Sequence, residues 1–91
     1  MVKDDEIFKT KLKIIYSLHK KRYYNKRHTP IDFLCKRNPA IPCKKIKKAI
    51  KELKKEEIIE VKPTYHGLDV CLNVKKKREI DYYLSMLNYQ H

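Results

Sequence analysis

Glycine is almost missing from this chain of 91 residues, which has one glycine and no tryptophan. The single glycine, Gly67, excludes the glycine-rich loops that hold nucleotide phosphates, both G-x-G-x-x-G and the P-loop. No apolar run approaches the roughly 20 residues of a membrane helix. The N-terminus, Met-Val-Lys-Asp-Asp-Glu, is too polar for a signal peptide. We therefore expect a soluble, cytoplasmic protein with no membrane partner.

Cysteine is also scarce, because the chain has only Cys35, Cys43 and Cys71. Disulfide scaffolds usually have an even number of cysteines, and zinc sites usually have paired ligands such as C-x2-C. We therefore expect each cysteine to be a small, partly buried hydrophobic residue, with no metal or other cofactor. The alternative is a split metal site made of Cys35, Cys43 and a histidine.

The histidines form no catalytic pattern. They lie in expected basic loops or at the end of the chain, and no spacing pairs one with a cysteine or a carboxylate. The four are His19, His28, His66 and His91. Together with the lack of a glycine-rich loop, this predicts that the protein is not an enzyme and has no small-molecule site.

Acidic residues are the minority of the charged residues. Lys and Arg number 23 against 11 Asp and Glu, which gives a formal net charge of +12. Such an excess attracts polyanions through counterion release and long-range steering. The alternative is a solvated, lysine-rich surface. Basic residues are concentrated in the segment HKKRYYNKRH, residues 19–28, and again in residues 75–78.

A hydrophobic content of 42% suits one small globular domain, residues 1–91. Periodicity and turn signals predict four helices and a hairpin. The helices are expected at about 5–20, 30–37, 42–56 and 79–89, and the hairpin at about 58–74. Thr29 is expected to cap the second helix with Pro30 at its first position, and Gly67 to form the hairpin tip.

The helix at 42–56 has two opposite stripes. Its apolar stripe consists of Ile46, Ala49, Ile50 and Leu53. The opposite row is entirely lysine: Lys44, Lys48, Lys51 and Lys55. Like charges at i,i+4 repel, so a helix built for solubility would usually mix signs on its outer face. The row therefore favours a binding surface, and a solvated lysine face is the alternative.

The outer helices each have one unusual feature. In the first, Lys11 lies within the apolar face, and we expect its charge to reach water. The last helix is apolar on two sides. One stripe is Ile80, Tyr83, Leu84 and Leu87, and the other is Tyr82, Met86 and Tyr89. The second stripe predicts a subunit contact, unless its tyrosines simply tolerate water.

The order of these elements resembles a winged helix-turn-helix domain. The likeness runs from Thr29 to Val74 and is most specific in IKKAIKELKKEEIIEV, which resembles a recognition helix followed by the first wing strand. The expected fold is therefore mainly α with a small β-hairpin, in the order helix-helix-helix-strand-strand-helix. Small dimeric regulators of archaea, bacteria and archaeal viruses have this arrangement.

The resemblance implies a double-stranded DNA-binding protein, acting as a transcriptional regulator and as a homodimer through its C-terminal helix. The helix at 42–56 would enter the major groove, and the wing would touch backbone or minor groove. The implied DNA contacts are Lys44, Lys45, Lys48, Lys51 and Lys55 on the helix, Thr29, Arg27 and His28 near the backbone, and Tyr65 and His66 at the wing tip. With no Arg, Asn or Gln on the helix's outer face, base selectivity should be modest. The alternative is a protein–protein or RNA interaction module of a transcription or replication assembly.

Overall fold

The computed structural model describes residues 2–89, and describes side chains for residues 6–87. Its elements are α1 (Val2–Lys20), β1 (Thr29–Pro30), α2 (Ile31–Arg37), α3 (Cys43–Lys55), β2 (Ile59–Thr64), β3 (Gly67–Leu72), the 3-10 turn η1 (Val74–Lys76) and α4 (Lys77–Tyr89). The prediction of a mainly helical chain with a small antiparallel sheet is confirmed. None of the described helices is long and apolar enough to cross a membrane.

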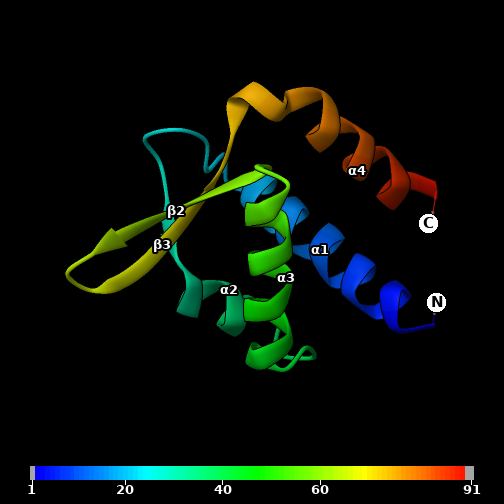
Figure 1. Cartoon of the computed structure of the whole chain (residues 1–91), viewed down its shortest axis with the longest axis horizontal. Helices are drawn as coiled ribbons and strands as arrows, with labels where there is room; N and C mark the ends of the chain where they lie inside the picture. Colours follow the sequence, from blue (N-terminus) through cyan, green and yellow to red (C-terminus); the bar gives the residue numbers. More distant parts are fainter. Residues whose placement is uncertain (1, 90–91) are drawn as a thin grey trace.

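The sheet has three antiparallel strands in the order β1-β3-β2. Strands β2 and β3 form a hairpin that projects from the helices (Figure 1). Helix α3 crosses in front of α1, and α4 lies on the side of the molecule opposite the hairpin tip. Strand β1 was not predicted. Its two residues pair with Val70 and Asp69 of β3, so the chain entering α2 completes the sheet.

Thr29 does not cap α2, as the sequence had suggested. The N-cap is Pro30, without a side-chain hydrogen bond, and Thr29 lies in β1 opposite Val70. A residue before proline is pushed towards extended backbone, which suits a strand better than a helix start. Thr29 is 1% exposed, and its hydroxyl has no hydrogen-bond partner among the described residues. It therefore cannot offer that hydroxyl to a phosphate.

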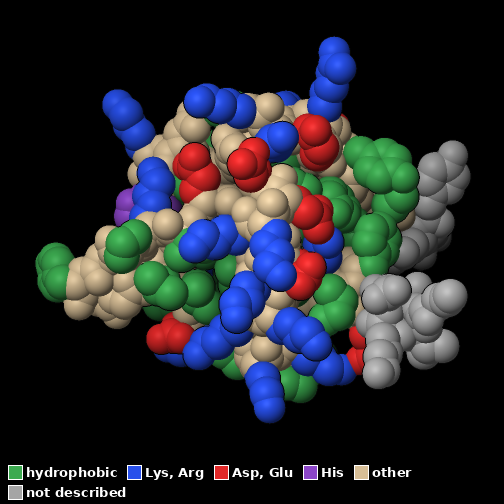
Figure 2. All heavy atoms as spheres, in the orientation of Figure 1, with side chains coloured by type: hydrophobic (Ala, Val, Ile, Leu, Met, Phe, Trp, Pro, Cys, Tyr) green, Lys and Arg blue, Asp and Glu red, His purple; other side chains and the backbone are tan. Residues whose placement is uncertain are grey.

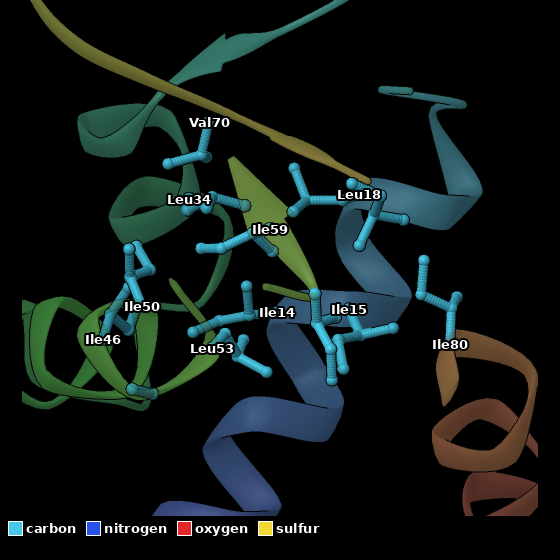
Figure 3. Close-up of a cluster of buried hydrophobic side chains, with 13 residues drawn as sticks. Ile14, Ile15, Leu18, Leu34, Ile46, Ile50, Leu53, Ile59, Val70 and Ile80 are labelled. Carbon is cyan, nitrogen blue, oxygen red and sulfur yellow. The ribbon is translucent and has the colours of Figure 1, made fainter. Parts of the chain in front are cut away.

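The core lies where α1, α3 and the sheet meet (Figure 3). The whole predicted apolar stripe of α3 is buried in it, together with Ile14, Ile15 and Leu18 of α1. Leu34 of α2 and Ile80 of α4 also belong to the cluster, and Ile80 lies at one end of it. Because α3 gives all its large apolar residues to this core, its opposite face is left to solvent.

Lys11 lies at the edge of the core, and its ammonium is paired with a carboxylate instead of extending freely into water. Its side chain is 11% exposed and its ammonium contacts the carboxylate of Glu56, at the end of α3. The hydroxyl of Tyr83 on α4 donates to the same carboxylate over 2.7 Å. Burial acts to lower the pKa of Lys11, but the hydrogen bond that Lys11 donates to Glu56 and the neighbouring charges raise that pKa overall. Glu56 thus ties α1, α3 and α4 together.

Cys35 and Cys43 form a disulfide, with Cα atoms 5.1 Å apart. It joins α2 to the first residue of α3. The prediction that these two cysteines act as separate hydrophobic residues was therefore wrong, and the alternative metal site does not form because both sulfurs are bonded. The intervening turn brings them together, and a spacing of eight residues carries no recognisable signal. Cys71 is free and buried, as expected, and burial raises the pKa of its thiol.

Replacing both Cys35 and Cys43 with serine is expected to lower the free energy of unfolding by about 2 kcal/mol, because the crosslink restricts the unfolded chain. For a domain of this size, the melting temperature should fall by about 10 °C. Thermal unfolding with and without dithiothreitol measures this. The reductant should lower the wild-type melting temperature and leave that of the serine variant unchanged. Equal melting temperatures for oxidised wild type and variant would contradict a stabilising role.

Helix α4 presents one stripe to the protein and one to its surroundings. Ile80 is buried, and Tyr83 and Leu84 pack against the core. On the other side, Tyr82 is 61% exposed and Met86 is partly exposed. The side chain of Tyr89, the third residue of the expected subunit contact, lies outside the described residues.

Candidate nucleic-acid interface

A groove of about 550 Å³ lies between α3 and the β2–β3 hairpin. Its floor is apolar, and its wall on the α3 side is made of lysines. The apolar residues are Ile31, Ile50, Val61 and Leu68, and the lysines are Lys44, Lys47, Lys48, Lys51 and Lys54. In Figure 2, basic side chains run down the middle of this face over α3, with apolar side chains between them and the hairpin. The groove combines positive charge with exposed apolar surface.

The lysines of this wall carry uncompensated charge. All are exposed, and none forms an ion pair with a described side chain. Lys44, Lys48 and Lys51 follow one another at four- and three-residue intervals, so they span about 10 Å along the helix. Their mutual repulsion is unfavourable for the free protein. A polyanion in the groove would relieve it.

Lys45 does not belong to this wall. Its ammonium contacts the carboxylate of Glu6 on α1, and that hydrogen bond is the main reason why the pKa of Glu6 is lowered. It lines a separate hollow between α1 and α3. The resemblance implied a DNA contact for Lys45, and the structure pairs it with Glu6 on the flank of α3 away from the hairpin.

Two groove lysines, Lys47 and Lys54, were missing from the predicted site. At about 100° per residue both lie on one flank of α3, but the sequence alone does not say which flank faces the hairpin. The structure turns their flank towards the hairpin. Lys55, which was predicted, is exposed at the last position of α3 and does not line the groove.

The hairpin tip carries two exposed rings. Tyr65 is 95% exposed, and its ring centroid lies 4.3 Å from that of His66. The Thr64 hydroxyl accepts a hydrogen bond from the backbone N–H of His66 and donates one to the carbonyl of Gly67, each over 3.2 Å. Gly67 has φ +134°, a conformation that side-chain-bearing residues rarely adopt. Tyr65 and His66 thus lie at the tip, where they were predicted.

The two basic residues before β1, Arg27 and His28, differ in how freely their side chains could contact DNA. Arg27 is exposed, and its guanidinium lies 5.7 Å from the ring centroid of Tyr23. His28 has its Nδ1 2.6 Å from a carboxylate oxygen of Asp69 on β3. That contact ties the loop to the sheet, so His28 has a structural role. Neither residue lines the groove between α3 and the hairpin.

Metal-ligating side chains do not gather anywhere in the described part of the chain. No three His, Cys, Asp or Glu side chains there are placed to hold a metal ion. The chemistry available at the groove is therefore that of lysine ammonium groups, apolar side chains and the aromatic hairpin tip.

Comparisons of the chain with protein-family models, with curated proteins and with solved structures found no match.

Proposed function

We propose that this protein binds double-stranded DNA as a winged helix-turn-helix domain and acts as a transcriptional regulator. Helix α3 would enter the major groove, and the β2–β3 hairpin would act as the wing on backbone or minor groove. The observation that carries the proposal is the set of exposed lysines on α3 that face the hairpin and have no ion-pair partner among the described side chains. The order of helices and hairpin along the chain supports it.

The shape of the surface suits a duplex. The major groove is about 12 Å wide and admits one α-helix. The outer row of α3 would enter it, and ammonium groups on the flanks would reach phosphates on either side. The apolar floor has Leu68, which is 50% exposed and could contact thymine methyl groups.

The all-lysine composition of this row limits base selectivity. A lysine can donate to guanine, but two-point discrimination of bases comes mainly from Arg, Asn and Gln. Further selectivity would come from the wing, from DNA shape, or from the spacing of two protomers. Selectivity through the spacing of two protomers requires a homodimer. The exposed stripe of α4, which includes Tyr82, supports such a dimer.

Selection of bound duplexes from a random pool, read at two salt concentrations, tests the proposal. If five lysines each neutralise one phosphate, log K should fall against log salt with a slope near −4.5. A palindromic motif would support a dimeric regulator. A salt-independent affinity, or preferential binding of a matched RNA pool, would contradict the proposal and favour the alternative module.

A further inference from the structure

A second basic surface lies on α1, away from the groove. The sequence has no acidic residue between Glu6 and Asp32, although it has many Lys and Arg in that interval. This segment includes most of α1 and the loop that follows it. The proposed DNA contact on α3 uses none of the exposed lysines of α1.

These lysines form a stripe of their own. At about 100° per residue, Lys9, Lys13 and Lys20 fall on the side of α1 opposite its buried residues, such as Ile14 and Leu18. All three are exposed. Tyr16 lies among them and is 48% exposed. None of the three lysines forms an ion pair with a described side chain. Helix α1 thus resembles α3: it has a buried apolar stripe and, on the opposite side, lysines that are unpaired among the described side chains.

The middle of this stripe is hollowed. A depression of about 430 Å³ is lined by Lys13, Tyr16, Ser17, Lys20, Lys21, Arg37 and Asn38. They come from three segments: α1, the turn after it, and the end of α2 with the residue that follows. No carboxylate of the described residues lines it. The guanidinium of Arg37 lies 5.9 Å from the ring centroid of Tyr23, which lines no part of the hollow. We call this hollow and Lys9 the α1 surface.

The α1 surface and the α3 groove face away from each other. Helices α1 and α3 pack together through their apolar stripes, so their outer faces point in opposite directions. In Figure 1, which looks down the shortest axis, α3 lies in front and α1 behind. The protein measures 22 Å along that axis. A straight duplex bound to α3 and the hairpin therefore cannot also cover the α1 surface.

We propose that the α1 surface binds the phosphate backbone of a second DNA segment, so that one molecule bridges two duplexes. Several cations around a hollow without acids favour a polyanion over a neutral partner. The hydroxyls of Tyr16 and Ser17 add donors of the kind that contact phosphates. Among the described residues, the only large apolar group of this surface is the half-exposed Tyr16, which is too little to anchor a membrane or a protein core. The proposal depends on the proposed function only for the first duplex.

A capture assay tests the bridge. One duplex is fixed to beads and saturated with protein, unbound protein is washed away, and a second, fluorescent duplex is added. Three double variants are compared with wild type: Lys13→Glu with Lys20→Glu on α1, Lys48→Glu with Lys51→Glu on α3, and Lys75→Glu with Arg78→Glu outside both surfaces. Each replaces two exposed cations with two anions, so the change in net charge is matched. Circular dichroism checks that each variant folds.

The α1 variant should capture the second duplex at least about 10-fold less than the Lys75/Arg78 control, while its affinity for a single duplex stays within about threefold of that control. Capture equal to the control would overturn the proposal, because bridging would then come from paired α3 grooves in a dimer. So would a single-duplex affinity as weak as that of the α3 variant, because the α1 surface would then be part of the first site. If the α3 variant binds a single duplex normally, the proposed function fails instead.

Discussion

Replacing Lys48 and Lys51 with glutamate should weaken the binding of a single duplex by about 100-fold or more at roughly 0.1 M salt. Both side chains are exposed, line the groove and have no ion-pair partner among the described side chains. The change removes two favourable contacts and places two negative charges against the phosphates. The magnitude of the salt slope should fall by about 1.8, since each neutralised phosphate contributes about 0.9. Fluorescence anisotropy over a salt series measures both quantities.

The Lys75→Glu/Arg78→Glu variant is the control for this loss. It carries the same change in net charge at exposed positions outside the groove. The long-range attraction between protein and DNA would fall in both variants. Only the α3 variant should lose most of its affinity and show the smaller salt slope. Equal losses in the two variants would show that total charge, rather than the α3 groove, determines binding.

Truncation of Leu53 to alanine should lower the free energy of unfolding by about 3 kcal/mol. Leu53 is fully buried at the centre of the core that holds α3 against α1. The loss combines the buried methyl groups with the cavity that they leave. In a domain of this size the melting temperature should fall by about 15 °C, which thermal unfolding followed by circular dichroism would measure.

Leu68 supplies the matched control for the core. It is the same residue type, but it is half exposed on the hairpin. Leu68→Ala should cost less than about 1 kcal/mol, because little apolar surface is removed from contact. If the two leucine variants unfold at the same temperature, the assignment of Leu53 to the core would be wrong.

The two faces of α3 could be predicted from the spacing of residues along the helix. Its apolar stripe is buried as predicted, because burial of one helix face requires apolar residues at a spacing that the sequence displays directly. The lysine row opposite is exposed for the same reason. Gly67 marked the hairpin, since few other residues adopt its backbone conformation.

Contacts between different helices and strands could not be predicted from residue spacing, because the residues that meet lie on different elements of the chain. Lys11 has no apparent role on the apolar face of its own helix. In the folded protein it contacts Glu56, at the end of α3, and Tyr83 of α4. Cys35 and Cys43 are bonded because the turn between α2 and α3 brings them together. Thr29 was assigned as a helix cap, but an available edge of β3 made it a strand residue.

The sequence by itself determined that this protein has a basic helix with one apolar and one lysine face, followed by a hairpin. Those properties follow from the helical and strand periods, which relate neighbouring residues. Only the tertiary structure decided that Lys47 and Lys54 face the hairpin, and that Lys45 turns instead to Glu6. It also placed Lys9, Lys13 and Lys20 on the face of α1 that points away from the groove. These outcomes depend on the rotation and packing of whole helices, which are set by residues distant in the chain.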